Sequence, residues 1–208
     1  MTVPDTKGCA VIDFGIEISS PASTQGELFV DSVTFAGKAK VDFPSQIPRD
    51  GDAPGWIRHA DHLGGTFSDD PGDFTHAGKN SERGLLVTGT TGWKDYTFEA
   101  RVKIHMADKG GILVRYQGLQ RYIALVRTHD NTLQLIERYY GDTVLAETAC
   151  RWKLDEPHTL RLVCKGTNIT AFCDGEKILE GEDRKLGCGG AGLIFEKGII
   201  GFNSVKVS

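Results

Sequence analysis

Arginine and glutamine side chains in the middle of the chain are the best candidates for binding a ligand. They lie between residues 111 and 148, in short runs rich in Ile, Leu, Val and Tyr. A guanidinium group binds carboxylates or phosphates through paired hydrogen bonds, and a glutamine amide bonds hydroxyl groups. The residues predicted to bind a ligand are Arg115, Gln117, Arg121, Arg127, Gln134 and Arg138. The alternative is that these arginines are solvated on an exposed sheet face or pair with Glu99 and Glu147.

Three aspartates lie close together in the segment DDPGD. The carboxylates of Asp69, Asp70 and Asp73 could together hold Ca²⁺, which binds oxygen ligands with little geometric demand. The competing interpretation is a turn, because Asp and Pro favour turn positions. Calcium is therefore the one metal that the sequence suggests, and no other cofactor is expected.

Motifs that carry a hydrolytic reaction are missing from the sequence. There is no G-x-S-x-G, H-E-x-x-H or phosphate-binding loop. Sandwich-type glucanases need two carboxylates on one face of a strand, but Glu99 has Arg101 beside it and Glu137 is followed by Arg138. Hydrolysis by this chain alone is not expected.

The candidate ligand residues lie on what the sequence predicts to be consecutive antiparallel hairpins. Four apolar runs are separated by loops of two to four residues that contain Gly, Asn or Asp. The residues predicted to face each other are Gln117 and Arg121, Arg127 and Thr132, and Tyr140 and Thr143 across the turn Gly141-Asp142. This register places on one apolar face Ile112, Val114, Tyr116, Tyr122, Ala124, Val126, Leu133 and Leu135. A sheet with one apolar face and one mixed face is half of a sandwich, and the mixed face is where a ligand could lie.

The rest of the chain divides into three parts. Residues 1–37 contain a strand pair, residues 11–18 and 26–35, which is either the tail of a preceding domain or an addition to the main one. Residues 38–83 are rich in Pro, Gly and charge and are predicted to be a linker with long loops. Residues 84–208 are predicted to form the sandwich core, with strict alternation from Phe98 to Ile104.

Composition excludes several classes of protein. The net charge of -4 argues against general nucleic-acid binding, and no apolar run is long enough to span a membrane. The five cysteines are an odd number without C-x-x-C spacing. Predicted register places Cys164 opposite Ile169 and Cys173 opposite Leu160, too far apart for a disulfide. Reduced cysteines and the absence of a signal peptide favour a cytoplasmic location.

Several motifs in order along the chain resemble the concanavalin A-like (laminin-G-like) jelly-roll domains. They are GTTGWKDYTFEARVKI, GGILVRYQGLQRYIALVR, a hairpin containing CDGEKILEGED, and the closing GIIGFNSVKV. The resemblance covers residues 84–207 and implies an antiparallel two-sheet jelly-roll sandwich. Members of this family often carry an Asp at the close, where this chain has Asn203 or Ser204.

The whole chain is also similar to the non-catalytic C-terminal region of some bacterial ADP-ribosylglycohydrolase-family proteins, and GELFVDSVTF resembles the last strand of galactose-binding-like modules. This resemblance implies a separate catalytic domain in the parent protein and an ADP-ribose-like ligand. It does not confer the activity of that domain, because the acidic di-metal motifs are not in this sequence.

Three functions are compatible with these observations. The first is an accessory module that binds carbohydrate or another sugar-containing ligand, which could be anionic. The second is a structural module that docks on the catalytic domain, with an apolar patch that this domain covers. The third is a hydrolase similar to the keto-glycoside hydrolase domains that share the jelly roll.

Overall fold

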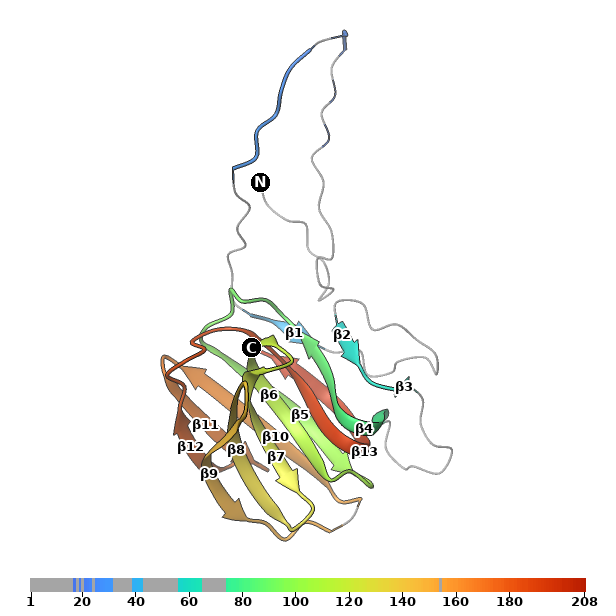
Figure 1. The fold of residues 1–208 in the computed structure, drawn as a ribbon, viewed down its shortest axis with the longest axis vertical. Helices are drawn as coiled ribbons and strands as arrows, with labels where there is room; N and C mark the ends of the chain where they lie inside the picture. The colour runs from blue at the N-terminus through green and yellow to red at the C-terminus, as the bar shows by residue number, and fades with distance from the viewer. Residues whose placement is uncertain are drawn as a thin grey trace.

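The structure is a computed structural model that describes residues 17, 19, 21–23, 25–31, 39–42, 56–64, 74–153 and 155–208. These residues form strands, turns and irregular segments, and none of them is helical (Figure 1). The strands are β1 Val41–Asp42, β2 Trp56–His59, β3 His62–Gly64, β4 Thr75–Thr88, β5 Tyr96–Ile104, β6 Lys109–Gly118, β7 Arg121–Thr128, β8 Thr132–Tyr139, β9 Asp142–Ala149, β10 Pro157–Lys165, β11 Asn168–Cys173, β12 Glu176–Glu182 and β13 Gly190–Val207. In the described part of the chain, no helix is long and apolar enough to cross a membrane.

The strands pair antiparallel in the order β12-β11-β10-β5-β13-β6-β7-β8-β9. This continuous ladder folds back on itself, because β12 contacts β9 and β10 contacts β6 across the interior. The long strand β13 belongs to both layers: residues 190–196 pair with β6, and residues 200–207 pair with β5. The all-β, antiparallel sandwich predicted from the sequence is therefore confirmed.

The main core lies between the two layers. Alternation along β5 buries Phe98, Ala100, Val102 and Ile104, as the sequence predicted. Inward side chains of β6, β7, β10 and β13 complete the same core. A sheet residue on this face packs against the opposite layer, so the core fixes which side of each strand faces outward.

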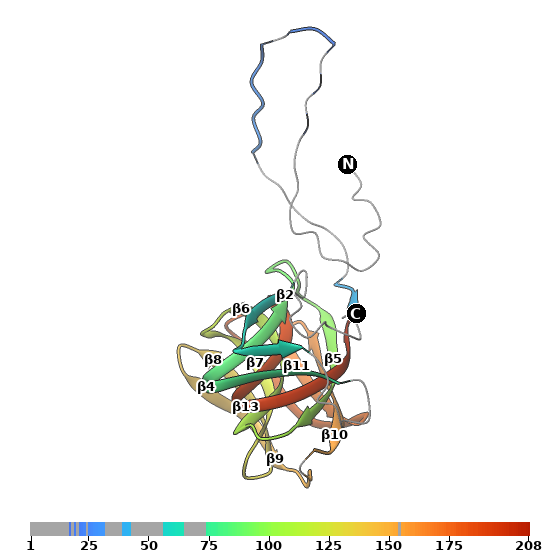
Figure 2. The ribbon, with the colours of Figure 1, turned by 90° about the vertical axis from the view of Figure 1, so that its right-hand side faces the viewer.

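Strand β4 corrects the predicted boundary at Gly84. Residues 75–83 were expected to be loop, but they form the first half of β4, which pairs with β13 and also with β2 and β3 (Figure 2). The sequence obscures this strand because residues 79–82 are polar, and residues 80–82 are exposed to solvent. Small residues such as Ala77 and Gly78 occupy its buried part. The polar and small residues of this segment therefore belong to a strand with an exposed part and a tightly packed part, and not to a linker.

The register of the central hairpin also differs from the predicted one. Ile112 pairs with Leu125 and Leu113 pairs with Ala124, which places Tyr122, Ala124 and Val126 on the face opposite to Ile112. The cause is a bulge between Val114 and Gly118, where the residue pairing shifts before the β6–β7 turn. A shift of one residue moves every side chain of a strand to the other face.

The next two hairpins are shifted as well. Arg127 pairs with Leu133 instead of Thr132, and Asp142 lies inside β9 opposite Arg138. The turn between β8 and β9 is formed by Tyr140, which has φ 59°, and Gly141.

Other predictions from the sequence have mixed outcomes. The register of β10 and β11 is confirmed, with Cys164 opposite Ile169 and Cys173 opposite Leu160. The four cysteines among the described residues, Cys150, Cys164, Cys173 and Cys188, form no disulfide. Residues 25–31, which cover part of the second predicted N-terminal strand, do not form a strand, and most of that strand pair lies outside the described residues.

Candidate functional site

The outer face of the layer that contains β4, β13, β6, β7 and β8 carries a second apolar cluster. Its members alternate along each strand with residues of the main core, so they point away from the opposite layer. They are Leu85, Val87, Leu113, Tyr122, Ala124, Val126, Ile136 and Ile194, all at most 2% exposed. An apolar outer face that is almost fully covered needs other side chains above it. We call this cluster the outer floor.

A cleft of about 600 Å³ lies at one end of the outer floor. Its lining residues are His59, Glu82, Arg83, Leu85, Leu119, Gln120, Arg138, Glu196 and Lys197. A smaller hollow of about 210 Å³ is lined by Ile57, Val87, Thr88, Gly89, Thr90, Thr91, Tyr116 and Gln117. Since His59 pairs with Leu85 and Ile57 pairs with Val87, the two depressions follow one another along β2 and β4.

An ionic network crosses the outer floor beside the cleft. Arg83 of β4 donates hydrogen bonds to the Tyr122 hydroxyl at 2.5 Å and to Asp142 Oδ2 at 2.9 Å, and it lies 3.5 Å from Glu196. Arg138 donates to the other oxygen of Asp142 at 2.9 Å. Strands β4 and β9 are separated by four strands in the pairing order, so the Arg83–Asp142 pair bridges the face and covers part of the outer floor.

Partial burial strengthens this network. Burial alone would raise the pKa of Asp142, but hydrogen bonds from Arg83 and Arg138 hold it below its ordinary value. Burial opposes the charge of Arg83, and the hydrogen bond to Asp142 nevertheless raises its pKa. The pKa of Tyr122 is raised by burial, although Arg83 partly opposes this. At neutral pH, the network therefore combines two guanidinium groups, the carboxylates of Asp142 and Glu196, and a neutral phenol.

An aromatic ring lines the smaller hollow, and two hairpin tips lie near the cleft. Tyr116 lines the smaller hollow, and its ring stacks near that of Tyr122 with centroids 6.5 Å apart. The tips of the β6–β7 and β8–β9 hairpins are joined by a hydrogen bond from Tyr140 N to Gln120 O at 3.0 Å. Leu119, which lines the cleft, is 51% exposed, and Tyr140 at the neighbouring hairpin tip is 71% exposed. Such partly exposed rings can pack against the apolar face of a sugar.

The predicted ligand residues divide between this face and other positions. Arg138 lines the cleft. Gln134 pairs in register with Val126 of the outer floor, and its amide donates to Glu147 at 3.0 Å, the residue that the sequence offered as a partner for the arginines. Gln117 lines the smaller hollow, but its amide donates to the carbonyls of Leu186 and Cys188.

Arg115 was predicted to face a ligand, and this prediction is wrong. Its side chain is fully buried, with Nε 3.7 Å from Asp183 and a hydrogen bond of 2.9 Å to Gly166 O. The φ of 56° at the bulge turns the side chain between the layers instead of outward.

Arg121 and Arg127 share the strand face of Ile123 and Leu125 and are not on the outer floor. Arg121 bonds Gln117 O at 3.3 Å, and Arg127 bonds Asn131 at 2.5 Å. Asp69, Asp70 and Asp73, predicted as calcium ligands, lie outside the described residues.

Sequence reasoning missed Arg83, Glu196 and Asp142. Arg83 was placed in a loop, and Asp142 was placed in a turn. The partners Arg83 and Asp142 are 59 residues apart, so no local pattern in the sequence connects them.

Comparison with known proteins decides the family. Residues 48–206, more than half of the chain, match the family described as the 3-keto-alpha-glucoside-1,2-lyase-like domain. The chain belongs to this family. The 3-keto-alpha-glucoside-1,2-lyase-like domain thus starts upstream of β2 and includes β4, in agreement with the strand pairing. No curated protein matches the sequence.

Solved structures with the same fold are distant in sequence. The carbohydrate-binding module CBM66 from Bacillus subtilis is 16% identical, with a TM-score of 0.64 over 74% of this chain and 96% of that chain. The exoplasmic/lumenal domain of VIP36, in a Ca²⁺/Man3GlcNAc-bound form, is 12% identical, with a TM-score of 0.57 over 81% and 86%. The alginate lyase AlgAT5 of polysaccharide lyase family 7 is 16% identical, with a TM-score of 0.53 over 73% and 84%. At these identities, the likeness shows the fold alone.

Proposed function

We propose that this domain binds a carbohydrate in the cleft and adjoining hollow on the outer floor. The observation that carries the proposal is that an apolar floor lies beneath two neighbouring depressions, of which one is lined by charged hydrogen-bonding groups and the other by the ring of Tyr116. Sugars offer an apolar ring face and many hydroxyl groups, so they need both kinds of contact. Among similar folds, a carbohydrate-binding module and a mannose-bound domain support this proposal.

The charges of the cleft favour a neutral sugar over an anionic one. The cleft carries as many positive as negative side chains. The positive ones are Arg83, Arg138 and Lys197, and the negative ones are Glu82, Glu196 and Asp142, which is bound to Arg83. A strongly anionic ligand would have to compete with these carboxylates for the arginines. Carboxylates accept hydroxyl hydrogens and guanidinium groups donate to hydroxyl oxygens, so this set suits vicinal hydroxyl groups.

The test is a glycan array followed by calorimetric titration with the best binder, with ADP-ribose as an anionic probe. We expect Tyr116→Ala and Glu196→Gln each to weaken binding about tenfold, equal to about 1.4 kcal/mol. The matched control is Phe172→Ala, an aromatic residue of β11 in the other layer, which should bind like the wild type. No binding to any neutral glycan, or equal loss in the control, would contradict the proposal.

Two finer proposals come from the sequence resemblances and are tested in the same experiment. Preference for ADP-ribose over neutral glycans would support an ADP-ribose-like ligand and the neighbouring catalytic domain. Loss of binding in EDTA and recovery in Ca²⁺ would support calcium at Asp69, Asp70 and Asp73.

A second candidate function is the elimination that the family description names. His59, Glu82 and Glu196 line the cleft beside two arginines, so it holds both candidate bases and groups that stabilise negative charge. In a 3-keto glucoside, the base would remove the hydrogen on C2, which is acidified by the adjacent carbonyl. The bond from C1 to the glycosidic oxygen would then break, and this oxygen would leave with the bonding electrons and take up a proton. Turnover of such a substrate that His59→Gln abolishes would support the lyase, and binding without turnover would support the module.

A further inference from the structure

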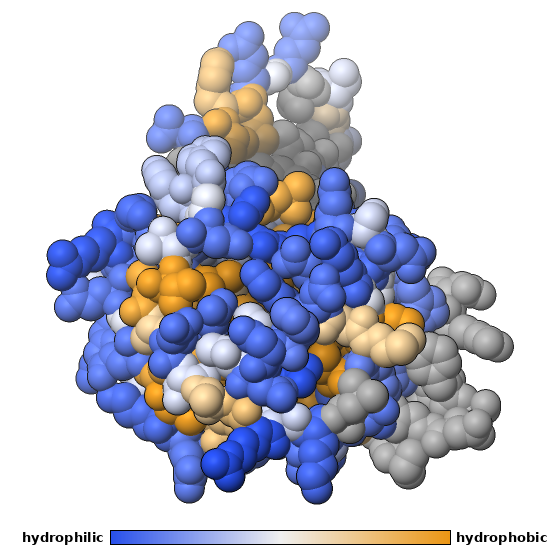
Figure 3. All heavy atoms as spheres, turned by 60° about the horizontal axis from the view of Figure 1, so that its bottom comes forward, coloured by the Kyte–Doolittle hydropathy of each residue, from blue (hydrophilic) through white to orange (hydrophobic). Residues whose placement is uncertain are grey.

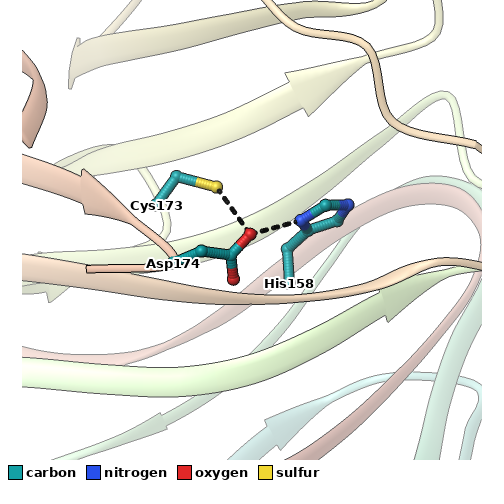
Figure 4. A group of neighbouring side chains, drawn as sticks. All are labelled: His158, Cys173 and Asp174. Atoms are coloured by element: carbon teal, nitrogen blue, oxygen red, sulfur yellow. Dashed lines mark hydrogen bonds and ion pairs between the residues drawn. The ribbon is translucent and has the colours of Figure 1, made fainter. Parts of the chain in front are cut away.

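Three side chains of different chemistry meet far from the cleft, at the hairpin of β11 and β12 (Figure 4). His158 lies in β10, Cys173 ends β11, and Asp174 begins the following turn. His158 Nδ1 is 2.7 Å from Asp174 Oδ2, and Cys173 Sγ is 3.7 Å from the same oxygen. One nitrogen, one sulfur and one oxygen atom all lie within 4.8 Å of one another.

The cluster sits where the interior of the sandwich opens to solvent. His158 and Cys173 share the strand faces of Leu160 and Ala171, which belong to the main core. The His158 side chain is only 13% exposed, whereas that of Asp174 is 52% exposed. Figure 3, which brings the bottom of Figure 1 forward, shows mainly hydrophilic side chains around small apolar patches. A ligand can thus approach from the Asp174 side while the other two donors stay shielded.

Neighbouring groups fix the orientation of these donors. Trp152 stacks on the His158 ring, with centroids 4.1 Å apart and planes inclined by 12°. The amide of Thr159 donates to Asp174 Oδ1 at 2.8 Å, which leaves Oδ2 turned toward His158 and Cys173. Donors that are held in place before a metal arrives lose less entropy when they bind it.

The second nitrogen of His158 gives an independent indication. Nε2 is buried and has no hydrogen-bond partner among the described residues, although Glu156 Oε2 lies 3.6 Å away. With a cation on Nδ1, the ring of a neutral histidine carries its proton on Nε2, where it would face the Glu156 carboxylate. Metal-binding histidines commonly direct their second N–H at a carboxylate in this way.

We propose that His158, Cys173 and Asp174 form a binding site for a divalent transition metal of the Zn²⁺ class. Imidazole and thiolate donors select such metals over Ca²⁺ and Mg²⁺, which prefer oxygen alone. Three protein donors leave a fourth position for water on the exposed side.

The test is titration of the full chain, kept reduced, with Co²⁺ and Zn²⁺. We expect one equivalent of Co²⁺ to produce a sulfur-to-cobalt charge-transfer band, to change the fluorescence of Trp152, and to be displaced by Zn²⁺. Cys173→Ser and Asp174→Asn should weaken Zn²⁺ binding at least about tenfold. The matched control is Cys188→Ser, because Cys188 is another half-buried free cysteine that lies outside the cluster and contacts Gln117.

Two results would overturn the proposal. One is wild-type protein with no sulfur-to-cobalt band at one equivalent, a measurement that needs no variant to fold. The other is Zn²⁺ binding that Cys173→Ser leaves unchanged or that Cys188→Ser weakens equally, with folding of each variant checked by circular dichroism. Because the cluster is remote from the cleft, neither result bears on carbohydrate binding.

Discussion

Replacing Asp183 with alanine is expected to destabilise the fold by about 3–5 kcal/mol, the usual loss when one member of a buried ion pair is removed. The Asp183 carboxylate is fully buried 3.7 Å from Arg115 Nε. It also accepts hydrogen bonds from the amides of Lys185, Leu186 and Gly187 at 3.1, 2.7 and 2.8 Å. The substitution therefore leaves a buried guanidinium without its counter-charge and a loop without its acceptor.

Losing the three hydrogen bonds from backbone amides to Asp183 does not contribute three full hydrogen-bond energies to this destabilisation. Lys185 and Gly187 are exposed, so their amides can regain water after the substitution. The amide of Leu186 is buried and cannot, and one lost bond to a charged acceptor costs about 1.5–3 kcal/mol. For a chain of this size, a loss of about 3–5 kcal/mol corresponds to a fall in Tm of about 6–20 °C.

Thermal and urea unfolding of the variant measure this loss. The matched control is Glu182→Ala, because Glu182 is the neighbouring acid and pairs at the surface with exposed Arg184. Its effect should stay within about 0.5 kcal/mol. Adding Arg115→Met to Asp183→Ala should recover part of the stability, because the unpaired charge is then gone. A loss below about 1 kcal/mol for Asp183→Ala, or no recovery in the double variant, would refute the reasoning.

Three further predictions concern other parts of the fold. Burial would raise the pKa of Asp142, but hydrogen bonds from two arginines outweigh it and lower this pKa in the folded protein. The ionised Asp142 carboxylate therefore stabilises the fold fully above the unfolded-state pKa of about 3.9, and this stabilisation is lost as the pH falls through the folded-state pKa. Asp142→Asn should therefore lose less stability than the wild type when both are unfolded by urea from pH 5 to pH 2, and equal losses would contradict this. Gly111→Ala should lower the free energy of unfolding by about 1–3 kcal/mol or more, because a Cβ there would lie 2.0 Å from the backbone carbonyl oxygen of Leu125. Gly141→Ala is the control: a Cβ at Gly141 would meet open space, so urea unfolding should change little. Burial raises the pKa of the Cys164 thiol to about 12, so it should react with a thiol reagent at pH 8 only after denaturant is added, and fast reaction of all cysteines in the folded protein would contradict this.

Local patterns in the sequence predicted much of the fold. Strict alternation from Phe98 to Ile104 identified β5 and its buried face, and the predicted register of β10 and β11 is the observed one. The β10–β11 hairpin was predictable because its pairing depends on residues close in sequence. Strand β5 was predictable because its buried and exposed faces differ in composition.

The central hairpins were harder because both of their faces are buried. In β7, Ile123 and Leu125 pack in the main core while Tyr122 and Ala124 pack in the outer floor. With apolar residues on both sides, alternation no longer indicates which face is which, and the bulge at Arg115 then decides the register. This is why the sequence placed the Arg115 guanidinium on a ligand face and the structure places it between the layers.

The sequence by itself determined that this chain forms an antiparallel β-sandwich, because the period of two and the turn residues are local properties. Only the tertiary structure decided which polar groups gather. Arg83 meets Asp142 from 59 residues away, and both come from segments that the sequence assigned to a loop and a turn. The candidate site exists because strands far apart in sequence, β4 and β9, meet across one face of the sheet, and contacts of that kind leave no periodic signal.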